Sequence, residues 1–137
     1  MVRLSNSQFN EIVGHALENR EAESCGILAS RDGQVVAIHR ARNVAETPRT
    51  RFQMDPIDIM NITDQIEEAG QDLFGFYHSH THTQAYPSPT DVADWPARWY
   101  PDAYCLICSL MEESRPTIRA FKISEDGKIT EEPVEVG

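Results

Sequence analysis

Two histidines one residue apart, His78 and His80, are the side chains of this chain best suited to chemistry. They follow a short apolar and aromatic run, 73–77, that is typical of a buried strand. Side chains alternate along a strand, so both imidazoles point to one face, with Cα atoms about 6.5 to 7 Å apart. At that separation both can bind one metal ion at about 2.0 to 2.1 Å each. A third ligand must come from another element.

Asp91 is the candidate for that third ligand, because residues 88–91 read Ser-Pro-Thr-Asp and are typical of a helix start. Ser88 is the expected N-cap, with Pro89 at the first helical position and Asp91 in the first turn. A capping box without any metal explains the same residues. The two interpretations are compatible, since an acid in the first turn can face the end of a neighbouring strand.

The full pattern, His78 and His80 followed after seven residues by Ser88 and then by Asp91, resembles the metal motif of the JAMM (MPN+) metallopeptidases. The family also places a catalytic glutamate upstream at the start of a strand, and Glu23, followed by Ser-Cys-Gly-Ile-Leu, has the matching shape. The resemblance implies the MPN fold, a curved mixed β-sheet flanked by helices in a layout similar to that of cytidine deaminases. It also implies Zn²⁺ bound by the two histidines and the aspartate.

The same residues suit hydrolysis of an amide bond. Two histidines and one aspartate leave the fourth tetrahedral position of Zn²⁺ open, which is typical of a catalytic site. Zn²⁺ lowers the pKa of a bound water to about 7. Glu23 is expected to take the proton of that water and hand it to the leaving amine, and Ser88 to donate to the oxyanion. By resemblance, these are the catalytic roles of the two positions in JAMM enzymes.

Two further residues compete for a place at this site. Glu21 lies two positions before Glu23, and only the sequence that follows Glu23 distinguishes them. Both glutamates could also be solvated loop charges, the usual position of this residue type. His82 would share a strand face with the other two histidines if the strand continued. The family motif gives His82 no role, so we expect it at the surface or at the rim of a pocket.

Beyond the motif, the chain is similar to the bacterial Mec-type JAMM hydrolases. This similarity covers most of the chain and rests on residues 77–81, 85–88, 90–92, 130–134 and the loop 43–55. Such enzymes act on a small ubiquitin-like sulfur-carrier protein and release an amino acid, notably newly made cysteine, from its C-terminal Gly-Gly end. The resemblance therefore implies a protein partner of this kind as substrate.

Three alternatives compete with this function. An isopeptidase that acts on ubiquitin-like conjugates is the strongest, because both substrates end in a flexible Gly-Gly tail. A non-catalytic MPN scaffold is disfavoured, since such domains typically lack ligands and none is missing here. A cytidine-deaminase-like zinc hydrolase needs an HxE and a PCxxC motif, and neither is present.

Composition limits the class of protein. The 137 residues suffice for one domain with its own core, so residues 1–137 are expected to form a single α/β or α+β domain. A formal net charge of −10 disfavours nucleic acid as a partner. No apolar run is long enough for a membrane span, and the N-terminus does not resemble a signal peptide. Three cysteines, an odd number, argue against a secreted disulfide framework, so we expect a cytoplasmic protein.

Periodicity and turn residues give the expected elements. A helix is expected from a Ser5 capping box to about residue 19, with Phe9, Ile12, Val13, Ala16 and Leu17 on one face. A second helix begins after Asp55 and ends at Gly70, and Pro96 keeps the helix after Ser88 short. Strands are expected at 25–30, 34–41, 73–77, 104–110, 116–123 and 128–136, with a brief one at Phe52 and Met54. Asp32-Gly33 and Asp126-Gly127 predict hairpin turns.

The segment 95–110 is rich in aromatic residues and also contains a CxxC pair. The aromatics are expected mainly in the core, with a share of them lining a groove or a subunit contact; they are Trp95, Trp99, Tyr100 and Tyr104. Cys105 and Cys108 should not bind one metal together, because positions i and i+3 of a strand point to opposite faces.

Four of the chain's 12 basic residues lie within 12 positions, at Arg40, Arg42, Arg49 and Arg51. A stretch of this kind is either a solvated surface run or a local positive surface that helps recruit a negatively charged protein. The sequence leaves both interpretations open.

Overall fold

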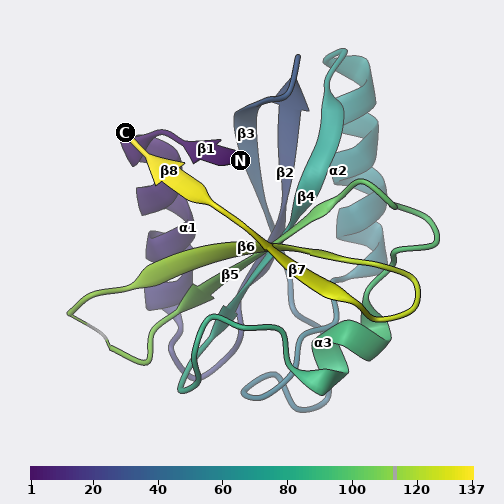
Figure 1. Cartoon of the computed structure of the whole chain (residues 1–137). Coiled ribbons are helices and arrows are strands. Elements are labelled where there is room, and N and C mark those ends of the chain that lie inside the picture. Colours follow the sequence, from purple (N-terminus) through teal and green to yellow (C-terminus); the bar gives the residue numbers. More distant parts are fainter. Residues whose placement is uncertain (113) are drawn as a thin grey trace.

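The computed structural model describes residues 1–112 and 114–137. Within these residues a six-stranded mixed sheet, in the order β3-β2-β4-β5-β6-β7, separates α1 from α2 and α3 (Figure 1). The helices are α1 (Asn6–Glu18), α2 (Pro56–Glu68) and α3 (Pro89–Asp94). The strands are β1 (Val2–Leu4), β2 (Cys25–Arg31), β3 (Gln34–Ala41), β4 (Asp72–His80), β5 (Tyr104–Ser109), β6 (Thr117–Ile123), β7 (Ile129–Glu132) and β8 (Val134–Val136). The expected mixed sheet flanked by helices is confirmed.

Both long helices begin where their caps predict. Before α1, Ser5 N donates to Gln8 Oε1 at 2.9 Å and Gln8 N donates to Ser5 Oγ at 3.0 Å, which completes the capping box. Before α2, the Asp55 side chain accepts from Ile57 N at 2.8 Å. Gly70, with φ of 68°, follows the end of α2, because glycine adopts this left-handed conformation without steric cost.

The register of β2 against β4 determines which residues meet at the end of the sheet. Asp32 and Gly33 both have positive φ, as a two-residue hairpin turn requires, and they join β2 to β3 as predicted. On its other edge β2 runs antiparallel to β4, with Cys25 paired to His78. β4 also pairs parallel with β5, so it is hydrogen bonded on both sides.

Two hydrophobic layers pack on the two faces of the sheet. Ile12 and Ala16 of α1 pack against Leu28, Tyr77 and Leu106 on one face. On the other face, α2 packs onto a separate cluster that includes Ile27, Ile62, Ile66 and Phe76. Cys105 and Cys108 belong to clusters on opposite faces, as alternation along β5 predicts.

Two strand predictions need correction. The strand expected over 128–136 is divided at Pro133, which has no N–H to donate, and β8 leaves the main sheet to pair in parallel with β1. Val2 N donates to Pro133 O at 2.8 Å, which begins this small second sheet. β1 itself was not expected. The brief strand at Phe52 and Met54 is reduced to one isolated bridge between Asn43 and Met54.

Three of the four aromatic residues in the segment 95–110 pack against the core, as expected, and the fourth, Trp99, does not. Trp95, Tyr100 and Tyr104 are half-buried and pack against the hydrophobic clusters. Trp99 is 74% exposed, and the Arg98 guanidinium lies 5.5 Å from its ring centroid. Trp99 lies in the turn after Pro96, where its N–H donates to the carbonyl oxygen of Pro96 at 3.1 Å.

No helix among the described residues is both long and apolar enough to cross a membrane. The cytoplasmic location stays a prediction.

Gly26 lies where two neighbouring groups leave no room for a side chain. A Cβ atom at this position would lie 2.2 Å from Tyr77 Cε2 and 2.4 Å from the carbonyl oxygen of His39. The register shifts of β2 lie further along the strand, between Leu28 and Ser30. Gly26 is therefore required by close packing and not by a bulge.

We predict that Gly26→Ala lowers the free energy of unfolding by about 1 to 3 kcal/mol, because the added methyl group overpacks a rigid strand. Gly14→Ala is the matched control, since a Cβ on Gly14 meets no atom within 4 Å. In the middle of a helix that change should stabilise by about 0.5 to 1 kcal/mol. Urea denaturation of both variants measures the difference. Equal midpoints for Gly26→Ala and the parent would contradict this packing argument.

Candidate metal centre

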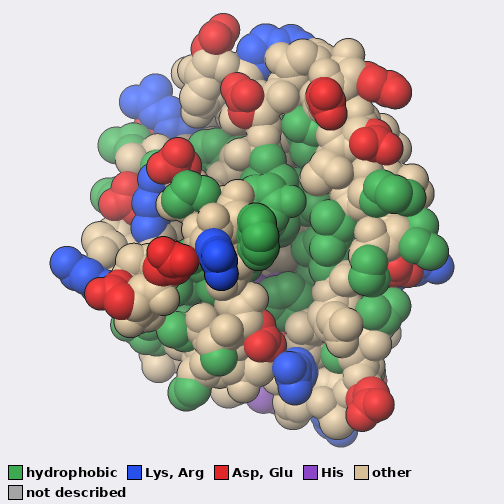
Figure 2. All heavy atoms as spheres, turned by 90° about the vertical axis from the view of Figure 1, so that its right-hand side faces the viewer, with side chains coloured by type: hydrophobic (Ala, Val, Ile, Leu, Met, Phe, Trp, Pro, Cys, Tyr) green, Lys and Arg blue, Asp and Glu red, His purple; other side chains and the backbone are tan. Residues whose placement is uncertain are grey.

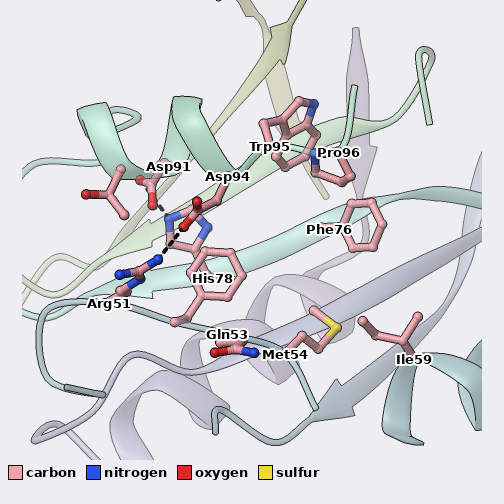
Figure 3. A pocket seen from close by; sticks show the side chains of 12 residues that line it. Arg51, Gln53, Met54, Ile59, Phe76, His78, Asp91, Asp94, Trp95 and Pro96 are labelled. Carbon is pink, nitrogen blue, oxygen red and sulfur yellow. Dashed lines mark hydrogen bonds and ion pairs between the residues drawn. The ribbon is translucent and has the colours of Figure 1, made fainter. Parts of the chain in front are cut away.

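Three polar side chains converge where the end of β4 meets the start of α3. Asp91 Oδ2 lies 3.1 Å from His78 Nε2 and 3.0 Å from His80 Nε2, and the two Nε2 atoms are 3.2 Å apart. All three residues are buried. Figure 3 shows the contact between Asp91 and His78, seen from the pocket beside it. The structure thus brings together the two histidines and the aspartate that the sequence singles out.

The spacing of these three atoms fits a shared cation. Ligand atoms about 2.0 to 2.1 Å from one tetrahedral centre lie about 3.3 Å from each other, close to the three distances observed. His80 Nδ1 lies 2.8 Å from the carbonyl oxygen of Gln84, which can only accept, so Nδ1 carries the hydrogen. The Nε2 atom of neutral His80 then carries a lone pair, and this lone pair faces the carboxylate oxygen Asp91 Oδ2. A cation or a proton between them removes this repulsion.

Asp91 also caps α3, so the two interpretations of residues 88–91 hold together. Ser88 N donates to Asp91 Oδ2 at 2.9 Å, and Asp91 N donates to Ser88 Oγ at 3.0 Å. The capping box is therefore confirmed, and the capping carboxylate is the one that faces the histidines. The cap fixes the direction of the Asp91 side chain before any ion binds.

Glu23 reaches the same site from the strand next to β4. Ser79 N donates to Ser24 O at 2.9 Å, which continues the register of β2 and β4 by one residue. The next pair along that register is Glu23 with His80. Ligand atoms of Glu23, His78 and His80 lie within 4.8 Å of one another, so these residues could hold a metal ion.

Glu23 is only 7% exposed, and its Oε1 atom has no hydrogen-bond partner among the described residues. Burial raises the pKa of Glu23 to about 7; nearby His80 lowers it and nearby Asp91 raises it. A buried carboxyl group with an open oxygen and a pKa near 7 suits proton transfer at neutral pH.

The charges of the three converging residues are strongly linked. Burial lowers the pKa of His78, because water no longer solvates the imidazolium. For Asp91, burial would raise the pKa, but its close contacts with both imidazoles hold it well below its usual range. For His80, burial lowers the pKa, but Asp91, the carbonyl oxygen of Gln84 and nearby Glu23 together outweigh burial and raise it. The carboxylate is therefore ionised, as a metal ligand must be.

The two competing residues lie outside this centre. Glu21 is exposed, and its carboxylate pairs with Arg49 at 3.3 Å. His82 is exposed in the segment after β4 ends, as expected for a surface residue. The geometry therefore distinguishes Glu23 from Glu21, which the sequence context alone did only weakly.

All four arginines of the positive stretch form ion pairs within the chain. Their partners are Glu11 and Glu18 for Arg40, Asp55 and Asp58 for Arg42, Glu21 for Arg49, and Asp94 for Arg51. All four arginine side chains are exposed, although Asp55 is buried, and ion pairs at the surface are typically worth about 0 to 1 kcal/mol. The stretch is therefore locally balanced in charge, and its contact with a substrate stays a prediction.

An apolar pocket of about 440 Å³ adjoins His78 and Asp91. It is lined mainly by Phe52, Met54, Ile59, Phe76, Trp95 and Pro96, and Figure 2 shows hydrophobic side chains around this hollowed face. Phe52 stacks on His78, with ring centroids 4.4 Å apart and an angle of 21° between the planes. Arg51 and Asp94 form an ion pair at 3.1 Å on the pocket wall (Figure 3).

The sequence did not identify Phe52 as part of the centre. Its only sequence signal was its position at the end of the arginine stretch, in the loop that resembles the Mec-type hydrolases. The stacking depends on how the loop 43–55 folds back, and no local pattern encodes that geometry.

The chain is similar to proteins with related activities. A family model described as prokaryotic homologs of the JAB domain matches residues 5–124. A desampylase from Haloferax volcanii is 42% identical over 108 residues, which cover 73% of this chain and 74% of that protein. A CysO-cysteine peptidase from Mycobacterium tuberculosis is 35% identical over 128 residues, which cover 93% of this chain and 85% of that protein.

Further similarities agree with these matches. A probable TtuB-protein conjugate cleaving protease from Thermus thermophilus is 33% identical over 91 residues, which cover 66% of this chain and 60% of that protein. The solution structure of a Desulfitobacterium hafniense protein matches with a TM-score of 0.87 and 30% identity, over 100% of this chain and 93% of that chain. The chain therefore belongs to the family of prokaryotic homologs of the JAB domain, and it is a JAMM-type hydrolase.

Proposed function

We propose that the protein is a zinc-dependent hydrolase that cleaves the amide bond after the C-terminal Gly-Gly of a ubiquitin-like sulfur-carrier protein. The released product would be an amino acid such as cysteine, and residues 1–137 would act as one domain. The observation that carries the proposal is the convergence of His78, His80 and Asp91, with Glu23 beside them. The substrate class is supported by the similarity to a CysO-cysteine peptidase over 93% of the chain.

A second candidate is an isopeptidase that acts on ubiquitin-like protein conjugates. Two relatives favour it: the desampylase at 42% identity, and the probable TtuB-protein conjugate cleaving protease at 33%. Both candidates use the same centre on an amide carbonyl and differ only in the amine that leaves. The substrate therefore has to be identified by experiment.

We assign the metal ligands as His78, His80 and Asp91. Asp91 Oδ2 contacts both Nε2 atoms, whereas Glu23 presents an open oxygen near them. Bound Zn²⁺ would act as a Lewis acid and lower the pKa of a water molecule to about 7. This division leaves one carboxylate to bind and the other to move protons.

The catalytic residues are assigned as Glu23 and Ser88. Glu23 removes the proton of the attacking water and transfers it to the leaving amine. Ser88 Oγ accepts from Asp91 N at 3.0 Å, and its hydroxyl hydrogen is then available for the oxyanion of the attacked carbonyl. Apolar side chains line much of the pocket beside His78, and a less polar surrounding strengthens these interactions.

The first test of the centre is its metal content. Elemental analysis of the purified protein should give about one zinc per chain, because three protein ligands with one open position are typical of catalytic zinc. His78→Ala should lose most of it, since the two remaining ligands bind weakly. The matched control is His82→Ala, which removes an exposed histidine and should keep the metal. Undiminished zinc in His78→Ala would sink the ligand assignment.

The second test concerns substrate and proton transfer. Carrier protein linked through its C-terminal glycine to cysteine, or to a lysine side chain, is incubated with the protein, and the products are identified by mass spectrometry. Glu23→Gln should keep zinc and fold but lose about 10² to 10⁴ in rate, because the proton shuttle is removed.

Glu21→Gln is the control for this measurement, since Glu21 is exposed and paired with Arg49. Faster release of cysteine than of lysine supports the sulfur-carrier function, and the opposite result supports the isopeptidase. Full activity in Glu23→Gln would remove this residue from the mechanism.

The third test separates the two roles of Ser88. If Ser88 donates to the oxyanion, Ser88→Ala should lose about 10² to 10³ in turnover. If it only caps α3, the cost is about 1 kcal/mol of stability with normal chemistry. Ser5→Ala is the matched control, because it removes the same type of cap from α1. We expect both variants to melt at lower temperature and only Ser88→Ala to lose turnover.

A further inference from the structure

Asn43 lies just after β3, and its side chain forms hydrogen bonds to several backbone segments around the site. Its side-chain Nδ2 donates to the carbonyl oxygens of Glu23 and Arg51, both at 3.0 Å, with that of Pro48 at 3.4 Å. Its Oδ1 accepts from Ala45 N and from Gln53 N, both at 3.0 Å. One half-buried amide side chain thus binds five backbone groups.

These bonds hold the loop 43–55 in a closed shape. Val44 N donates to Gln53 O at 2.8 Å, so the two ends of the loop also bond directly. Asp55 N also donates to Arg42 O at 2.9 Å, and these two bonds together form the single bridge between Asn43 and Met54. Beyond this bridge, the Asn43 side chain adds bonds to Ala45, Arg51 and Gln53, and so joins both ends of the loop.

Asn43 and Pro48 together hold the backbone of Glu23. Its carbonyl oxygen accepts from Asn43, and its N–H donates to Pro48 O at 2.7 Å. On the far side of the peptide, Ser24 N donates to Ser79 Oγ at 2.8 Å. Since Glu23 Oε1 has no partner of its own among the described residues, its placement depends on these backbone contacts.

The loop that Asn43 closes also forms one wall of the site. Phe52, next to two of the bonded residues, stacks on His78, and Arg51 reaches Asp94 of α3. Thr81, just after β4, donates to Arg49 O at 3.4 Å. A shift of the loop would therefore move Glu23 and the pocket wall together.

We propose that Asn43 is a positioning residue, which fixes Glu23 against the two histidines and holds Phe52 on His78. This inference rests on the proposed function of Glu23. Asparagine suits the role because one primary amide both donates and accepts. An ionised aspartate in its place would be unable to donate, so Asn43→Asp keeps the bonds from Ala45 and Gln53 and loses those to Glu23 and Arg51.

The first arm of the test does not depend on activity. Amide hydrogen exchange is measured by NMR on the purified protein, with zinc content determined in parallel. The Glu23 amide donates to Pro48 O, and Asn43 bonds both the Glu23 and the Pro48 carbonyls, so in Asn43→Asp the Glu23 amide should exchange about tenfold faster. The Gln53 amide, which donates to Oδ1 of residue 43, should stay protected. Asn43→Ala should expose both amides. Asn61→Ala, an exposed asparagine on α2, is the matched control and should change neither.

The second arm asks whether Asn43 acts through Glu23. With zinc retained, Asn43→Asp should lower kcat by about 10- to 100-fold, because small displacements of a catalytic group are costly. In a Glu23→Gln background the same substitution should change the residual rate by less than about threefold, since no base remains to be positioned. A purely structural role would give the same loss in both backgrounds and would overturn the proposal.

The two arms separate this inference from the proposed function. If the parent cleaves neither conjugate, the proposed function fails. The amide hydrogen-exchange rates then test on their own whether Asn43 fixes Glu23. If the Glu23 amide keeps its protection in both Asn43→Asp and Asn43→Ala, Asn43 does not position this residue and the inference is wrong. Loss of protection together with non-additive kinetics supports it.

Discussion

The packing of a carboxylate oxygen against two imidazole nitrogens in a buried site is the constraint on which the rest of the structure depends. Asp91 Oδ2 lies 3.0 and 3.1 Å from His80 and His78, and all three residues are buried. Burial of an ionised group is costly unless partners compensate for lost water. Here compensation comes from the proton or cation that the carboxylate shares with the imidazoles and from the N–H of Ser88. Asp91 therefore belongs both to the cap of α3 and to the candidate metal centre.

This constraint explains why β4 lies inside the sheet. His78 pairs with Cys25 on one side and with Ile107 on the other, so ladders on both edges fix the depth and direction of its side chain. The antiparallel register that places Cys25 opposite His78 also carries Glu23 to His80. A slip of one residue would turn Glu23 to the other face of the sheet, because side chains alternate. The register of one strand pair thus sets the distance between the proposed ligands and the proposed base.

Local chemistry explains which parts of this arrangement the sequence predicted. The Ser5 and Ser88 caps, the Asp32-Gly33 turn and the alternation of His78 and His80 each depend on a few neighbouring residues. Family resemblance supplied Glu23, whose proximity to the histidines requires a pairing of distant segments.

The features that the sequence did not predict depend on contacts between distant residues, which no local sequence pattern indicates. β8 and β1 pair although they lie at opposite ends of the sequence. The short β8 resembles a continuation of β7, from which only Pro133 separates it. Asn43 is a lone polar residue in a loop, and only the closed loop reveals its five backbone contacts. The arginine stretch left open whether it is a solvated surface run or a positive surface, and in the structure each arginine has a carboxylate partner from elsewhere in the chain. A protein with a net charge of −10 can supply such partners readily. An acidic carrier would therefore have to displace an existing partner, most directly Asp94 from Arg51 at the pocket wall, so recruitment by charge depends on an exchange of ion pairs.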